Sequence, residues 1–199
     1  QLSETSFCFL FARSYHQSMK HAAEARQELK IRTLFNLCGP LSNPAKPNYQ
    51  LVGVASADLI MPMIESLKLL GKSRALVVHG ADGMDEISLS QDTHGLYLDQ
   101  NGKIDEWHLS PRALDLKPVE MKEFVGGDAE ENAEITKSIL SGEESPRADI
   151  TNLNAAAAIW LTGKETTLEQ SYALAKDLQQ SGAGIEVLNK VLEFQKYDQ

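Results

Sequence analysis

The chain has 199 residues, 42% hydrophobic and 24% charged, which are proportions typical of a globular protein with a sizeable core. Its formal net charge of −9 at pH 7 argues against broad binding to nucleic acid and against an anchor to an anionic membrane. No apolar run reaches the roughly 18 residues of a spanning helix, and no signal-peptide pattern is found. We therefore expect a cytoplasmic protein.

The first apolar segment, residues 7–12 (FCFLFA), indicates either a buried strand or a tight connector. It contains Cys8, and the second cysteine, Cys38, also has apolar neighbours. Neither cysteine has a CxxC or CxxH neighbour, which argues against a zinc site and favours two buried free thiols.

Residues 16–29 are rich in helix formers and place small and apolar side chains on one face, which predicts a helix. Residues 32–44 begin like a helix. They end in two proline-containing dipeptides that predict a rigid bend, Gly39-Pro40 and Asn43-Pro44. Such a bend can line a substrate tunnel or be simply a turn, and the pattern does not separate these alternatives.

A strand, a helix and a second strand follow. Residues 49–56 and 73–80 are apolar on both faces and predict buried strands, and residues 57–71 predict a helix that ends at Gly71. This is a βαβ unit, and continuous apolar strands imply helices on both faces of the sheet. We therefore predict an α/β fold with a mainly parallel sheet flanked by helices, in a single domain that spans residues 1–199.

Residues 94–109 form two alternating segments around Asn101-Gly102, which predicts an antiparallel hairpin at or beyond the sheet edge. The remaining sequence predicts helices, the last over residues 185–197. The first of these helices follows Gly126-Gly127. That dipeptide resembles a phosphate loop, but a glycine turn with Asp128 as N-cap is the better interpretation, because no GxGxxG or Walker pattern is present.

The most informative loop follows the second predicted strand and carries Asp82, Gly83, Asp85 and Glu86. Ligands of open α/β sheets bind beyond the carboxyl ends of strands. Adjacent carboxylates there suit Mg²⁺, which takes oxygen ligands and bridges to substrate phosphates. The alternative is a solvated acidic turn whose aspartates cap a local helix.

Arg26 is a second candidate, because a guanidinium can bind a carboxylate through two hydrogen bonds. The alternative is a surface arginine paired with Glu24 or Glu28 on a neighbouring helical turn. His16 and His21 are ambiguous in the same way. No Ser-His-Asp or Cys-His set rises above chance, so we predict no catalytic residue.

Taken together, these segments resemble the anthranilate phosphoribosyltransferase family from about Phe7 to about Phe194. The resemblance is carried in chain order by six segments: HQSMKHAAEARQELKIRTLFNLCGPLSNP, QLVGVAS, ALVVHGADGMDEIS, GGDAEENAEI, NLNAAAAIWLTG and SGAGIEVLNKVLEF. The first and third together are specific. The implied fold is the C-terminal domain of the class that contains nucleoside phosphorylases and phosphoribosyltransferases.

The resemblance implies transfer of phosphoribose from phosphoribosyl pyrophosphate (PRPP) to the amine of anthranilate, a step of tryptophan biosynthesis that requires Mg²⁺. It places Arg26 at the anthranilate carboxylate, Asp85 and Glu86 at Mg²⁺, and Gly39 and Pro40 at the anthranilate tunnel, with His16 beside them. The implied catalysis is positioning and charge stabilisation. The full-length protein is expected to be a homodimer that binds no nucleic acid and no membrane.

Family members also have an N-terminal helical domain and a glycine-rich GTGGD loop, which residues 1–199 do not include. We therefore expect residues 1–199 alone to have no appreciable transferase activity. Two alternatives are a pyrimidine nucleoside phosphorylase of the same fold and a non-catalytic binding protein of this fold. The DGMDEIS and NLCGPLSNP segments and the Asp85-Glu86 pair favour the transferase.

Overall fold

The computed structural model describes residues 1–11 and 35–197. These residues form two compact units, 1–47 and 48–199, and each is described by itself. That they belong to one domain stays a prediction. No helix among the described residues is both long enough and apolar enough to cross a lipid bilayer.

The first unit contains two short helices, α1 (Leu2–Thr5) and α4 (Phe35–Leu41). Between α1 and the limit of the description at residue 11 the chain is irregular, so the alternative of a buried strand in FCFLFA is wrong for residues 7–11. The three phenylalanines of this segment are exposed, and no described strand pairs with it. Both cysteines are free but half-buried rather than buried.

The predicted bend lies later than expected. Gly39 and Pro40 are inside α4, so the prediction of a bend at this dipeptide is wrong. The helix ends where the amide and the hydroxyl of Ser42 both donate to the carbonyl of Cys38. The chain then turns at Asn43, whose side-chain oxygen accepts a hydrogen bond from the Ala45 amide at 2.9 Å. The bend at Asn43-Pro44 is therefore confirmed.

The second unit is built on a four-stranded sheet in the order β1-β2-β3-β4. Its strands are β1 (Tyr49–Gly53), β2 (Arg74–Gly80), β3 (Thr93–Leu98) and β4 (Ile104–Leu109). β1 and β2 are parallel, whereas β2–β3 and β3–β4 are antiparallel. The α/β class is confirmed, but the sheet is mixed rather than mainly parallel, because the described chain supplies one βαβ unit and one hairpin.

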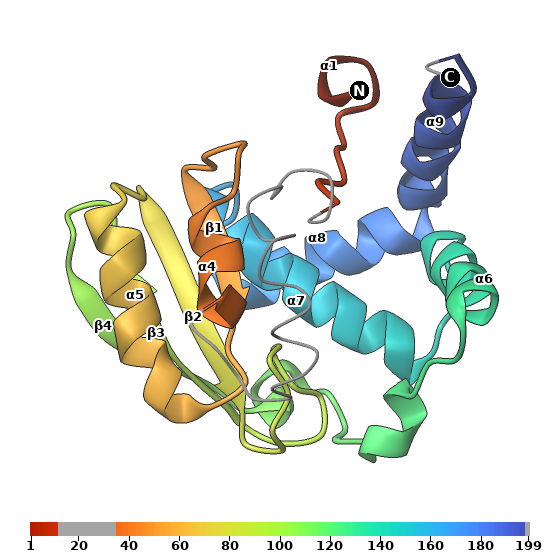
Figure 1. Ribbon diagram of the computed structural model, residues 1–199. Coiled ribbons are helices and arrows are strands. Elements are labelled where there is room, and N and C mark those ends of the chain that lie inside the picture. The colour runs from red at the N-terminus through yellow and green to blue at the C-terminus, as the bar shows by residue number, and fades with distance from the viewer. Residues whose placement is uncertain (12–34, 198–199) are drawn as a thin grey trace, which may run out of the picture. The chain divides into compact units, whose positions relative to one another are not determined.

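Helices cover both faces of this sheet (Figure 1). A 3₁₀ turn, Ala57–Leu59, leads into α5 (Ile60–Leu69), which buries side chains at helical spacing against β2 and β3. These buried residues are Ile60, Met63, Ile64 and Leu67. Gly71 follows the helix at φ 73°, as the sequence predicts for a helix end.

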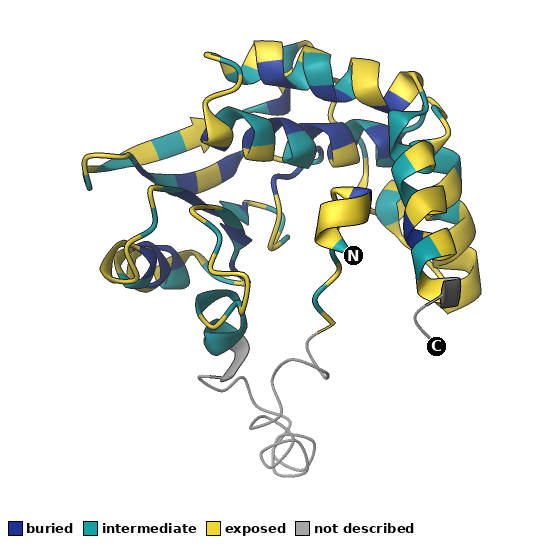
Figure 2. Cartoon of the chain, turned by 90° about the horizontal axis from the view of Figure 1, so that it is seen from above, coloured by how far each residue is buried: buried dark blue, intermediate teal, exposed yellow. Residues whose placement is uncertain are grey.

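The opposite face packs on α7 (Pro146–Thr162), which contacts β1 and β2. The core of this layer joins buried side chains of β2, β4, the loop after β2, and α7: Leu76, Val78, Ile87, Leu109, Leu153, Ala157 and Leu161. Along α7 buried residues alternate mainly with half-buried ones, as expected for a helix that packs on the sheet on one side and on other helices nearby (Figure 2). β1 lies at the edge of the described sheet, and it is therefore less buried than its apolar sequence predicts.

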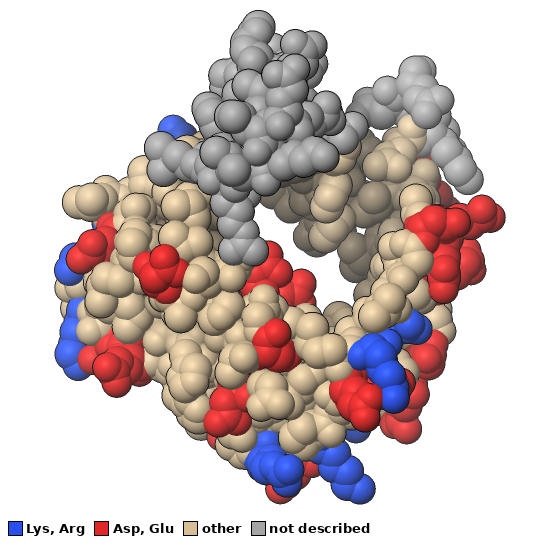
Figure 3. All heavy atoms as spheres, turned by 60° about the horizontal axis from the view of Figure 1, so that its bottom comes forward, with Lys and Arg blue, Asp and Glu red and all other residues tan. Residues whose placement is uncertain are grey.

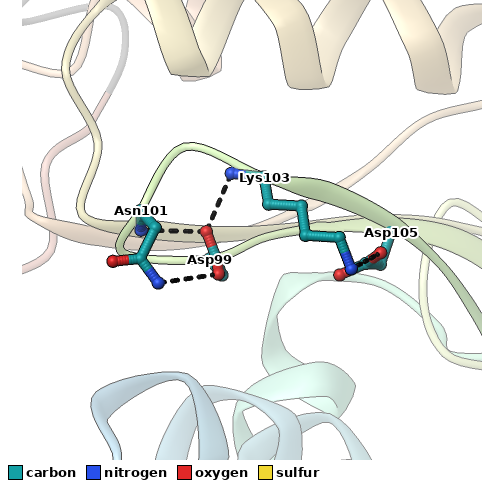
Figure 4. Close-up of polar contacts among 4 residues, drawn as sticks. All are labelled: Asp99, Asn101, Lys103 and Asp105. Carbon is teal, nitrogen blue, oxygen red and sulfur yellow. Dashed lines mark hydrogen bonds and ion pairs between the residues drawn. The ribbon is translucent and has the colours of Figure 1, made fainter.

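The hairpin confirms the sequence prediction. β3 and β4 are joined by residues 99–103, with Gly102 at φ 79°. Asp99 accepts hydrogen bonds from the amides of Asn101 and Lys103 at 2.9 and 2.8 Å, and Lys103 pairs with Asp105 at 2.6 Å (Figure 4). This turn therefore satisfies its own polar groups.

The rest of the chain is helical. Two 3₁₀ turns, Pro111–Leu114 and Met121–Phe124, precede α6 (Ala129–Leu140), whose N-cap Asp128 accepts from the amides of Glu130 and Glu131. This confirms Asp128 as a cap rather than part of a phosphate loop. Beyond α7 lie α8 (Leu168–Gln180) and α9 (Ala183–Tyr197).

Candidate metal-binding loop

The acidic loop, residues 81–88, begins where β2 ends, at the carboxyl edge of the parallel strand pair. The amide of Gly80 donates to the carbonyl of Met84, and the amide of Gly83 donates to the carbonyl of Gly80, both at 2.9 Å. Gly83 has φ 94°, a conformation that L-residues with side chains rarely adopt. The loop therefore turns back tightly over the strand ends.

Asp82 has a structural role within this loop. Its carboxylate accepts hydrogen bonds from the amide of Met84 and the hydroxyl of Ser88. Ser88 is fully buried, and its own amide donates to the Thr93 hydroxyl at 2.9 Å. Asp82 thus stabilises a turn, as the alternative of a solvated acidic turn expected, but no described helix begins in residues 81–92 for it to cap. Each of its two carboxylate oxygens accepts one hydrogen bond.

Asp85 and Glu86 differ from Asp82. Both are exposed, and among the described residues neither side chain has a hydrogen bond or an ion pair. The pKa of Glu86 is raised above its ordinary value. Partial desolvation of its carboxyl is the larger cause, and repulsion from the charge of Asp85 is the smaller one. Two adjacent carboxylates with no cation partner in the described part of the chain are a pair that a bound cation would stabilise.

The backbone of Asp85 lies directly against the end of β1. A Cβ atom added to Gly53, the last residue of that strand, would lie 1.5 Å from the carbonyl oxygen of Asp85. Contacts this short do not occur between non-bonded atoms, so only glycine permits the loop to cross here. Gly53 thereby lets the acidic pair lie over the carboxyl end of the neighbouring strand.

A second contact fixes the backbone of Ile87, the residue that follows the acidic pair. The side-chain oxygen of Asn154, on α7, accepts a hydrogen bond from the amide of Ile87 at 2.9 Å. The side-chain nitrogen of Asn154, Nδ2, donates to the carbonyl of Ile87 at 3.0 Å and to the carbonyl of Ile150 at 3.0 Å. Sequence reasoning missed Asn154. The available signal was a polar residue in the alanine-rich, buried stretch NLNAAAAIW.

The donor set has a recognisable chemistry. No group of three or more His, Cys, Asp or Glu is placed to hold a metal ion in the part of the chain that is described. Two carboxylates alone do not make the closed cage of a structural zinc or calcium site. They fit Mg²⁺, which binds through one or two carboxylates, keeps several waters and shares substrate phosphates.

The described structure does not place the other predicted site residues relative to this loop. Arg26 and His16 fall in residues 12–34, outside the described residues. Gly39 and Pro40 lie in α4 of the first unit, whereas Asp85 and Glu86 lie in the second.

The surface in Figure 3 carries acidic side chains across the visible face and basic ones mainly towards its margins. The described residues of that face therefore show no broad basic patch of the kind that binds nucleic acid.

Comparison with known proteins connects this geometry to a family. Residues 1–185 match the family model described as glycosyl transferase family, a/b domain. An anthranilate phosphoribosyltransferase from Petrotoga mobilis is 41% identical over 196 residues, which cover 98% of this chain and 57% of that protein. The chain thus spans little more than half the length of the curated relatives it matches.

Solved structures agree in fold. The anthranilate phosphoribosyltransferase of Thermus thermophilus superposes with a TM-score of 0.86 at 38% identity, covering 97% of this chain and 57% of that one. The Saccharomyces cerevisiae enzyme in complex with PRPP and Mg has a TM-score of 0.80 at 26% identity, with coverages of 88% and 50%. With its family model matched over most of its length, the chain belongs to the glycosyl transferase family, a/b domain.

Proposed function

We propose that the full-length protein is an anthranilate phosphoribosyltransferase of tryptophan biosynthesis. The observation that carries the proposal is the Asp85-Glu86 pair, which has no partner among the described residues and lies over the carboxyl ends of β1 and β2 in a chain of this family. The relatives' names and the PRPP and Mg complex of the yeast neighbour support the choice of substrates.

The proposed reaction forms one bond and breaks one. The amine nitrogen of anthranilate bonds to the anomeric carbon of the ribose, the bond from that carbon to pyrophosphate breaks, and the amine releases a proton to solvent. Asp85 and Glu86 would hold Mg²⁺, which when bound neutralises negative charge on the pyrophosphate. Because the leaving group needs charge stabilisation rather than protonation, no acid or base residue is required of this chain.

Arg26 is proposed to bind the carboxylate of anthranilate through two hydrogen bonds, with His16, Gly39 and Pro40 beside the same substrate. The support is the position of these residues in the motif that resembles the family, since residues 12–34 lie outside the described structure. The full-length protein is further proposed to be a cytoplasmic homodimer.

The test is the loss of anthranilate fluorescence when the full-length protein is mixed with PRPP and Mg²⁺. We expect consumption of anthranilate that requires all three additions. A protein that instead cleaves a pyrimidine nucleoside in the presence of phosphate would be the phosphorylase of the same fold. A protein that does neither would be the non-catalytic alternative, and either result would contradict the proposal.

An Arg26→Lys variant sharpens the substrate assignment. Lysine keeps the charge but cannot make two parallel hydrogen bonds to a carboxylate. The expected result is a higher KM for anthranilate with the KM for PRPP unchanged. Glu130→Gln, on the exposed surface of α6, is the matched control and should leave both values unchanged.

A further inference from the structure

We propose that Asn154 is a positioning residue for the metal-binding carboxylates, and that it acts by fixing the peptide groups of Ile87. The inference rests on the proposed function, because it assigns the carboxylates to Mg²⁺. Asn154 itself is not a ligand and touches no substrate in this proposal. Its role is to set where the chain can place Glu86.

The contact is complete on both sides. Ile87 offers one donor and one acceptor from its backbone, and the Asn154 side chain satisfies both, at 2.9 and 3.0 Å. Ile87 itself is fully buried in the core beside α7. A loop residue 67 positions earlier in the sequence is thus tied to a helix of the sheet's covering layer.

A side-chain amide meets all the requirements at this place. The side chain must accept from one amide while it donates to two carbonyls, those of Ile87 and Ile150. A side-chain amide has two N–H donors and an oxygen that can accept two hydrogen bonds, so both donors and one of the two acceptor positions are used. Aspartate lacks the donors, and alanine or leucine would leave the Ile87 amide and carbonyl without this partner.

The two anchors flank the acidic pair. On one side the Asp85 carbonyl lies against Gly53, and on the other side the Ile87 backbone is bound by Asn154. Glu86 sits between these fixed points. Groups that orient metal ligands from outside the coordination shell affect metal affinity about 10–100-fold when they are removed. We therefore assign that size of effect to Asn154.

The test compares Asn154→Ala with Asn152→Ala in the full-length protein. Both positions lie on α7, and alanine favours helix at each. Asn152 is buried and donates to Gln179 on α8 at 3.5 Å, so its variant perturbs the same helix away from the acidic loop. If Asn154→Ala does not fold, Asn154→Leu, which keeps roughly the size of the side chain and removes both its acceptor and its donors, takes its place.

Two readouts are measured, and the first needs no metal. Hydrogen exchange of the Ile87 amide in the metal-free protein should accelerate in Asn154→Ala and not in Asn152→Ala. The second is the Mg²⁺ concentration that gives half-maximal activity, which should rise about 10–100-fold in Asn154→Ala. A merely structural defect would lower the amount of active enzyme, and hence the maximal rate, without moving that concentration.

The outcomes separate the inference from the proposed function. Unchanged exchange at Ile87, or accelerated exchange with an unchanged Mg²⁺ requirement, overturns the role of Asn154. In the second case the metal assignment survives, provided that Glu86→Gln still raises the Mg²⁺ requirement. If Glu86→Gln has no effect on that requirement, the metal assignment fails and the role of Asn154 fails with it.

Discussion

The carboxylates of two acidic loops of the same sheet differ in their polar contacts and in the direction of their pKa shifts. In the β3–β4 hairpin, Asp99 accepts bonds from the turn itself, and Lys103 pairs with Asp105 (Figure 4). Hydrogen bonds lower the pKa of Asp99, and the largest contribution comes from the backbone amide of Lys103. In the loop after β2, Asp85 and Glu86 have no partner among the described residues, and the pKa of Glu86 is raised. Acidic residues that stabilise a turn thus differ electrostatically from acidic residues that remain available to a ligand.

The largest expected effect comes from adding a side chain at Gly53, where the loop that carries Asp85 and Glu86 crosses the end of β1. Gly53→Ala would place a Cβ 1.5 Å from the carbonyl of Asp85, so the loop must shift. Because a displacement of about 1 Å in a reacting geometry can cost on the order of 100-fold, we expect a loss of activity of about that size. Steady-state kinetics at several Mg²⁺ concentrations measure it.

Gly71→Ala is the matched control for this substitution. An alanine there would be strained at φ 73° but would meet no atom within 4 Å. It should cost about 1 kcal/mol of stability and leave the Mg²⁺ dependence unchanged. If Gly53→Ala were as active as Gly71→Ala, the close contact with Asp85 would not position the loop.

The next effect is on stability as a function of pH. The raised pKa of Glu86 means that the folded protein binds this proton more tightly than the unfolded chain does. The protonated Glu86 side chain therefore stabilises the folded state below about pH 4.5, and this stabilisation is lost as the pH rises through the raised pKa. Without metal, Glu86→Gln should therefore be at least as stable as the wild type above that pKa.

Thermal unfolding from pH 4 to 8 in EDTA, and again with Mg²⁺, tests this expectation. Mg²⁺ should raise the melting temperature of the wild type at neutral pH and raise that of Glu86→Gln less, because one of the two proposed ligands is missing. A Glu86→Gln variant that is less stable than the wild type in EDTA over the whole range would show that the carboxylate stabilises the fold.

The smallest effect belongs to the hairpin. The pKa of Asp99 is lowered, so its contribution to stability is present above its ordinary value of about 3.8 and is lost as the pH falls through the lowered pKa. Asp99→Ala should therefore lower the melting temperature slightly at pH 7 and not at pH 2. The Mg²⁺ requirement should not change, and a change in it would remove the distinction between the two loops.

The sequence predicted the parts of the fold that depend on local pattern. The buried run of β2, the Asn101-Gly102 hairpin and the acidic pair after β2 are each readable within a few residues. Its errors have physical causes. Pro40 suggested a bend, but the chain stays helical until Ser42 bonds back to Cys38.

The residues that position the candidate site could not be found in this way. Asn154 binds a backbone 67 residues away, and Gly53 matters because a loop of another element crosses it. Both roles arise from the packing of α7 and β1 around β2, and no local propensity encodes them. A polar residue within an apolar helical stretch is the signal that sequence reasoning can use for such positions.

The most direct measurement is the rate of anthranilate consumption by the full-length protein as Mg²⁺ is varied, in the wild type and in Asp85→Asn/Glu86→Gln. We predict that the double variant folds and requires at least about tenfold more Mg²⁺ for half-maximal rate. The neutral side chains keep the shape of the loop and remove the charges that would bind the ion. A folded double variant with the same Mg²⁺ dependence as the wild type would contradict the assignment of this pair to the metal.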